Sequence, residues 1–127
     1  MKYICLAYAE ENKLNSLTKS EWDSLRNETL AYVDELKHRG TLISAEPLQS
    51  VHNATTVRVR NYKLLVTDGP FAVTKEMLGS FFLIDATHLD EAIQIAVKWP
   101  SARLGSIEIR PIESELRENG RYESLSD

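Results

Sequence analysis

Only one cysteine, Cys5, occurs among the 127 residues of the sequence. A lone cysteine cannot form an internal disulfide, so nothing in the sequence indicates an oxidising compartment. No apolar run approaches the roughly 18 residues that cross a bilayer, and the first residues do not make a signal peptide. We therefore expect a cytoplasmic protein that is not embedded in a membrane.

Positive charge is also scarce, and the motifs of several enzyme classes are missing. The formal net charge is -4 and no basic run is longer than Lys37-His38-Arg39, which argues against direct binding of nucleic acid. Glycine-rich nucleotide loops and the Gly-x-Ser-x-Gly motif of serine hydrolases are absent. His52 and His88 have no partners at metal-ligand spacing, so neither a metal nor a cofactor is expected.

The composition is otherwise that of an ordinary folded domain, with 43% hydrophobic and 27% charged residues. A chain of this length makes one core rather than two. We expect a single domain over residues 1–112, followed by a polar tail over 113–127 with too few apolar residues to pack by itself.

Local patterns predict six strands and two helices. Thr18 and Glu21 have the spacing of a capping box, and Gly40 supplies a left-handed stop, which bounds the first helix. The second helix is expected to be capped by Thr87 and ended by Pro100. The strands are predicted over residues 3–8, 41–46, 55–60, 63–67, 81–84 and 106–112.

Two of these strands carry further information. Residues 3–8 are almost uninterruptedly apolar, which predicts a central strand buried on both faces. Residues 55–60 alternate between apolar and polar side chains and lead through Asn61-Tyr62 into the next strand, which predicts a hairpin.

The predicted order β-α-β-β-β-β-α-β is a split β-α-β pattern with a hairpin inserted in its middle. Two helices can cover only one face of the resulting antiparallel sheet. The other face carries side chains too apolar for water, so a second copy of the chain is its simplest cover. We therefore expect an α+β fold and a homodimer.

Several segments closely resemble the DGPF family, a branch of the YCII-related domain proteins. Asp68-Gly69-Pro70-Phe71 is the tetrad that names that family, and Pro100-Ser101-Ala102-Arg103 and residues 105–111 are also similar to it. The resemblance covers roughly residues 1–112. It implies a ferredoxin-like fold, a dimeric α+β barrel that pairs through its sheets.

The resemblance does not bring a reaction with it. Wider YCII-related proteins are thought to use a His-Asp dyad, with the His on the first helix and the Asp just before a proline after the second. This chain has only His38, in the last turn of the first helix, and Trp99 before Pro100. Some DGPF proteins also resemble companions of alternative sigma factors, which suggests an accessory or sensing role.

Asp68 is the first candidate site residue. An aspartate at a strand end beside a glycine turn can serve as a general base or ligand anchor, although it often only accepts backbone N–H groups in an Asx-turn. Lys75 and Glu76 follow in the same loop, where they could hold an anionic ligand or pair with each other.

A second group of candidates lies on the predicted strands. Arg58, Glu108 and Arg110 occupy polar faces, and together they could present a carboxylate flanked by guanidinium groups. The alternative, which we prefer, is a cross-strand ion pair between Glu108 and Arg110. Arg103 either caps the C-terminus of the second helix or reaches the cleft. For Cys5 we expect core packing and a raised thiol pKa.

Two functions lead from the sequence, and a purely structural domain with neither kind of site is a third option. The first is a dimeric module, regulatory or accessory, whose cleft binds a small polar or anionic molecule. The alternative is a small-molecule enzyme of lyase or hydrolase type that uses Asp68 or Glu108 as a general base. An enzyme would have a closed pocket, whereas a binding module would have an open groove with paired carboxylates.

Overall fold

The computed structural model describes residues 1–114. Within them lie six strands, three α-helices and two short 3-10 helices. In chain order these are β1 (Lys2–Ala9), α1 (Glu11–Asn15), α2 (Lys19–His38), β2 (Leu42–Pro47), η1 (Val51–Asn53), β3 (Thr55–Arg60), β4 (Lys63–Asp68), β5 (Met77–Asp85), α3 (Leu89–Val97), η2 (Pro100–Arg103) and β6 (Gly105–Pro111). The sequence did not predict α1 or the 3-10 helices, and most of the predicted tail lies outside the described residues.

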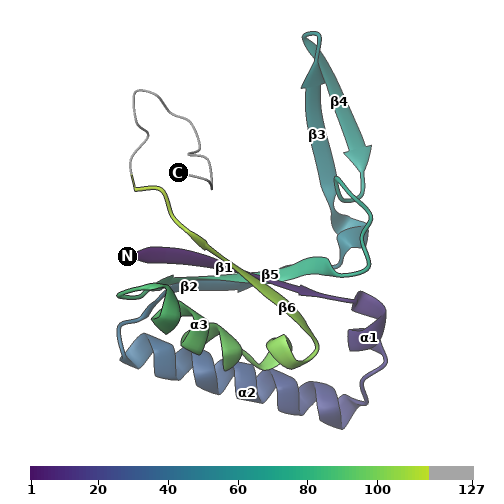
Figure 1. Ribbon diagram of the computed structural model, residues 1–127. Coiled ribbons are helices and arrows are strands. Elements are labelled where there is room, and N and C mark those ends of the chain that lie inside the picture. The colour runs from purple at the N-terminus through teal and green to yellow at the C-terminus, as the bar shows by residue number, and fades with distance from the viewer. Residues whose placement is uncertain (115–127) are drawn as a thin grey trace.

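Four strands form one antiparallel sheet in the order β2-β5-β1-β6, and the two long helices α2 and α3 lie on one face of it (Figure 1). The predicted α+β class, the ferredoxin-like strand arrangement and the one-sided helix layer are therefore confirmed. The strands β3 and β4 form a separate two-stranded sheet. In this part of the chain no helix is both long and apolar enough to cross a membrane.

The core lies between the sheet and the helices. Phe82 is fully buried and stacks on Trp99, with ring centroids 4.1 Å apart. The Tyr32 hydroxyl donates to the Ile95 carbonyl at 2.7 Å, which joins the two helices. Cys5 also packs in this core, and burial raises the pKa of its thiol to about 12.

Strand β1 is central, as predicted, but it is not buried on both faces. Tyr3, Cys5, Ala7 and Ala9 are buried, whereas the residues between them are only half-buried. Since side chains alternate along a strand and the helices cover a single face, the other face of β1 stays partly open.

The predicted N-terminal cap is correct for α2 but not for α3. At α2 the capping box is confirmed, because the Glu21 amide donates to the Thr18 hydroxyl at 3.1 Å and the Thr18 amide donates to the Glu21 carboxylate at 2.9 Å. At α3 the prediction of Thr87 as the cap is wrong. His88 takes that position with an extended backbone, and its Nδ1 accepts from the Glu91 amide at 3.2 Å. The Thr87 hydroxyl instead donates to the Glu91 carboxylate at 2.7 Å.

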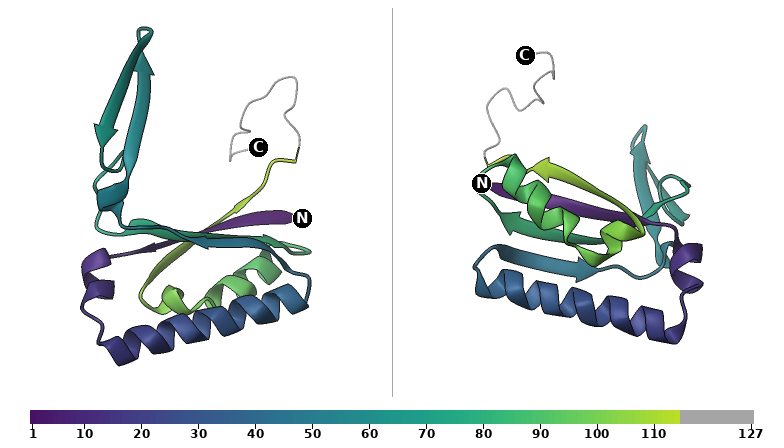
Figure 2. Two further views of the ribbon diagram at one scale, coloured as in Figure 1. Left: turned by 180° about the vertical axis from the view of Figure 1, so that it is seen from behind. Right: turned by 60° about the horizontal axis from the view of Figure 1, so that its bottom comes forward.

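The hairpin of β3 and β4 is confirmed with its turn at Asn61-Tyr62, where both residues have positive φ, 50° and 63°. This is the backbone that two-residue hairpin turns require. The hairpin stands away from the four-stranded sheet, on the side opposite the helices (Figures 1 and 2).

Candidate functional site

A pocket of about 610 Å³ lies at the foot of the hairpin. Four segments far apart in the sequence build it: the start of α1, η1, the end of β4 with its turn, and the loop that leads into β5. Its lining residues are Glu10, Glu11, Asn12, Val51, His52, Asp68, Gly69, Pro70, Val73, Thr74, Lys75 and Met77. Two residues predicted from the sequence, Asp68 and Lys75, are thereby brought into one pocket.

The turn after β4 fixes the position of Asp68. Gly69 has a φ of 110°, a backbone conformation that glycine adopts without strain. Its amide donates to the Ala54 carbonyl at 2.7 Å, and its carbonyl accepts from the Thr56 hydroxyl at 2.8 Å. The Asp-Gly-Pro segment is therefore held at both sides of the glycine, and Asp68 lies at the edge of the pocket.

Two of the three carboxylates of the pocket are engaged within the chain. Glu11 accepts from the Ser50 hydroxyl at 2.9 Å and from the Val51 amide at 2.8 Å, which attaches η1 to α1. Glu10 lies 3.5 Å from the Lys75 ammonium. Asp68 is exposed, and no hydrogen bond or ion pair reaches its carboxylate from residues 1–114. An Asx-turn at Asp68, the structural alternative, is therefore not formed.

Two further candidates, Arg58 on β3 and Glu76 in the loop before β5, each connect this loop to a neighbouring strand. The Arg58 guanidinium donates to the Phe71 carbonyl at 3.3 Å, and the Glu76 carboxylate accepts from the Ser106 hydroxyl at 2.8 Å. Lys75 contacts Glu10, so the alternative of a Lys75–Glu76 pair is wrong. Neither Arg58 nor Glu76 lines the pocket.

Glu108 and Arg110 lie on β6, away from the pocket. Because their neighbours Ile107 and Ile109 pack against the core, the two charged side chains belong to the face without helices. Their charged groups are 3.7 Å apart. The preferred ion pair is thus present, but it forms within one strand and not across two.

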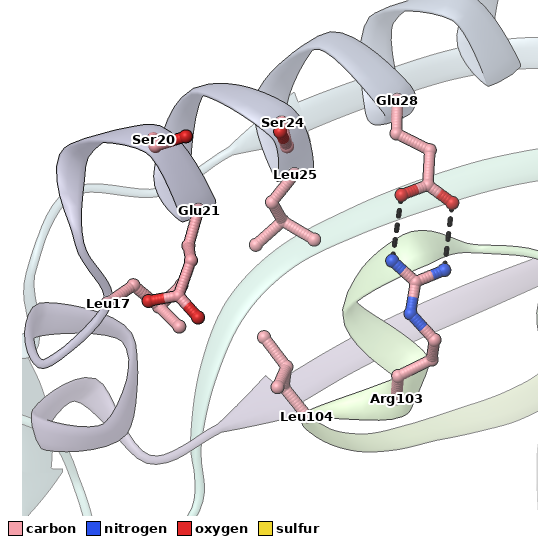
Figure 3. Close-up of a pocket in the computed structure, with 8 residues that line it drawn as sticks. All are labelled: Leu17, Ser20, Glu21, Ser24, Leu25, Glu28, Arg103 and Leu104. Carbon is pink, nitrogen blue, oxygen red and sulfur yellow. Dashed lines mark hydrogen bonds and ion pairs between the residues drawn. The ribbon is translucent and has the colours of Figure 1, made fainter.

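Arg103 lies on the helix side of the molecule. Its guanidinium donates two hydrogen bonds to the Glu28 carboxylate, at 2.8 and 2.7 Å, beside a smaller pocket of about 290 Å³ (Figure 3). The bonds from Arg103 lower the pKa of the Glu28 carboxyl, and the bonds to Glu28 raise the pKa of the Arg103 guanidinium. Arg103 thus links η2 to α2, and its expected place in the cleft stays a prediction.

Histidines do not form the dyad that wider relatives are thought to use. His38 is exposed at the end of α2, with its Nδ1 3.0 Å from the Asp34 carbonyl oxygen, and Trp99 is buried in the core. Residues 1–114 contain no group of three or more histidine, cysteine or acidic side chains arranged to hold a metal ion.

Sequence reasoning missed Glu10, Glu11 and His52 as pocket residues. The only local signal for the glutamates was their position directly after a central strand, because side chains at strand ends gather at one edge of a sheet. His52 was interpreted as a surface residue, and nothing near it in the sequence indicated a neighbouring pocket.

Comparisons with known proteins agree on the family and the fold. The YCII-related domain family matches residues 1–115. An uncharacterised protein from Rhizobium meliloti (strain 1021) is 34% identical over 114 residues, which cover 88% of this chain and 92% of that protein.

Among solved structures, the chain is similar to 5-chloro-2-hydroxyhydroquinone dehydrochlorinase (TftG) from Burkholderia phenoliruptrix AC1100, in complex with 2,5-dihydroxybenzoquinone. The TM-score is 0.56 with 16% identity, covering 89% of this chain and 94% of the other. At this identity the likeness concerns the fold alone. The predicted DGPF branch of the family stays a prediction.

Proposed function

The chain belongs to the YCII-related domain family, and from this premise we propose that it is a homodimeric module that binds a small polar molecule in the pocket beside Asp68. The observation that carries the proposal is the Asp68 carboxylate, which has no partner within residues 1–114 and lines an open pocket whose other carboxylates are engaged. An open pocket with two of its three carboxylates paired is closer to a binding module, whereas an enzyme is expected to enclose its carboxylate in a closed pocket. The remaining carboxylate, that of Asp68, is the group that we assign to the ligand.

The charges of the side chains that line the pocket indicate which class of ligand it could bind. Glu10, Glu11 and Asp68 line the pocket together with a single ammonium group, that of Lys75. Since Lys75 already lies next to Glu10, the pocket retains an excess of negative charge. This favours a ligand with hydrogen-bond donors or positive charge over the anionic ligand that the sequence left open.

The pocket is tested by a thermal-shift screen of small polyols, amines, amides and carboxylates against the wild type and Asp68→Asn. A ligand at about one hundred times its Kd stabilises the native state by about 2.7 kcal/mol, which raises the melting temperature by several degrees. We expect donor-bearing compounds to stabilise the wild type and to lose most of this effect on Asp68→Asn.

The matched control is Asp34→Asn, which removes an exposed carboxylate of α2 that does not line the pocket. It should respond as the wild type does. Equal shifts in all three proteins, or shifts with carboxylates alone, would reject the proposed role of Asp68.

The homodimer is proposed because the sheet face without helices is apolar at its centre. Ile4 and Leu6 on β1 pair with Leu83 and Phe81 on β5, and all four are only half-buried. A face of this kind is unfavourable in water and is typical of an interaction surface. A second copy would cover it by symmetry, with the same face on both partners.

Light scattering coupled to size-exclusion chromatography tests the homodimer. We expect a particle of twice the 14.4 kDa chain mass at micromolar concentration. A particle of 14.4 kDa that persists as the concentration rises would contradict the homodimer. The ligand-binding proposal would be unaffected, because the thermal-shift screen tests it separately.

A lyase or hydrolase is the second candidate, with Asp68 as a general base. Its support is the Asp68 carboxylate, which lacks a partner in the described part of the chain and shares the pocket lining with His52. The fold shared with a dehydrochlorinase also supports it. Glu108 is the weaker base because Arg110 lies 3.7 Å from it. Turnover of a compound found in the screen, lost in Asp68→Asn, would favour this candidate over a binding module.

A further inference from the structure

The hairpin of β3 and β4 carries its apolar side chains on one face. Paired residues of two antiparallel strands lie on the same face, and the register places Val57 opposite Val66 and Val59 opposite Leu64. The other face carries Arg58, Arg60 and Lys63, with Leu65 and two threonines. The hairpin is therefore an amphipathic ribbon.

The apolar face of this ribbon is not covered by the described part of the chain. Val57, Val59, Leu64 and Val66 are 60%, 61%, 65% and 59% exposed. The ties from the hairpin to its own loop, from Thr56 to Gly69 and from Arg58 to Phe71, both start on the other face. A two-stranded hairpin alone is marginally stable in water, so four exposed aliphatic side chains on one face indicate a missing partner.

The position of the hairpin indicates which partner could cover its apolar face. It rises on the same side of the molecule as the sheet face without helices (Figures 1 and 2). Six residues per strand give a height of about 20 Å at about 3.3 Å per residue, whereas two stacked sheets lie about 10 Å apart. A second sheet stacked on the open face would therefore lie beside the hairpin. The hairpin is long enough to extend past that second sheet.

We propose that the apolar face of the hairpin, formed by Val57, Val59, Leu64 and Val66, docks on a second copy of this chain. In a twofold dimer stacked through the open sheet faces, each hairpin flanks the partner, and the arrangement is reciprocal. One interface then covers both apolar surfaces on this side of the molecule. The inference rests on the proposed homodimer and adds the hairpin to its interface.

Analytical ultracentrifugation over a concentration series tests this with two lysine substitutions at adjacent positions. Val66→Lys places a charge on the apolar face, and Leu65→Lys places the same charge on the opposite face, where Leu65 is 47% exposed. Burying an unpaired charge is costly, so we expect Val66→Lys to raise the Kd of the dimer at least about tenfold. Leu65→Lys should leave the Kd close to that of the wild type.

A milder variant, Val66→Thr, keeps the β-branched shape and tests the same contact if Val66→Lys does not fold, as judged by circular dichroism. It should weaken the dimer in the same direction. A dimeric wild type whose Kd is equally unchanged in Val66→Lys, Val66→Thr and Leu65→Lys would overturn the docking of the hairpin and leave the homodimer intact. A monomeric wild type would overturn both.

Discussion

Replacing Phe82 by alanine is expected to lower the free energy of unfolding by about 3–5 kcal/mol. Phe82 is fully buried, and its ring stacks on Trp99 with 4.1 Å between the centroids. The substitution removes the apolar contact and leaves a cavity that the surrounding sheet and helix cannot fill completely. Because domains of this size are stable by about 5–15 kcal/mol, the variant would lose a large part of its stability.

Chemical denaturation followed by circular dichroism measures this loss. Phe71→Ala is the matched control, since it removes the same side chain from a loop position that is 80% exposed. It should change the free energy of unfolding by less than about 0.5 kcal/mol. Similar losses in the two variants would mean that the Phe82–Trp99 stack is not the centre of the core.

Gly105→Ala is the second substitution for which we expect a large effect, a loss of about 1–3 kcal/mol. A Cβ atom at Gly105 would collide with the Tyr8 carbonyl oxygen on the neighbouring strand. Both atoms belong to the ladder between β1 and β6, where Gly105 pairs with Ala9. The strands would have to separate locally to admit the methyl group, at the expense of their hydrogen bonds.

The same measurement on Gly79→Ala supplies the control. Gly79 lies in β5 with a negative φ, and the nearest atom to an added Cβ is the Ala7 carbonyl oxygen at 3.9 Å, an ordinary contact. Its replacement should be neutral or slightly stabilising, because alanine loses less backbone entropy on folding. If Gly105→Ala is as stable as Gly79→Ala, the close approach of β6 to β1 does not constrain the sheet.

Most of the fold could be predicted because its signals are local. The capping box at Thr18, the left-handed Gly40 and the alternation over residues 55–60 each depend on neighbours a few residues away. Predictions failed where two local solutions compete. Thr87 and His88 can both cap α3, and the backbone conformation chose His88.

The sequence could not predict which faces of the strands are buried by other elements. The alternation in β3 predicts a strand with one apolar face, but it does not say that this face has no partner in its own chain. In the same way, the apolar run in β1 indicated burial on both faces, whereas helices cover only one. Burial depends on the whole assembly, and so it is not encoded in a short segment.

The candidate site was predictable only where its residues lie in a locally marked segment. Asp68 and Lys75 were found because the Asp-Gly-Pro turn and its loop are marked in the sequence. Arg103 was assigned to a helix cap or a cleft, but its partner Glu28 is 75 residues away. Long-range partners of charged side chains follow from packing, and no spacing rule indicates them.

The burial of Cys5 has a practical consequence for studying the hairpin. With its thiol pKa raised to about 12 and no exposed surface, this cysteine stays protonated and out of reach of alkylating reagents at neutral pH. A cysteine introduced at the fully exposed Tyr62 would then be the one thiol that accepts a fluorophore or spin label. Site-specific labelling at the hairpin tip is therefore possible without first substituting Cys5.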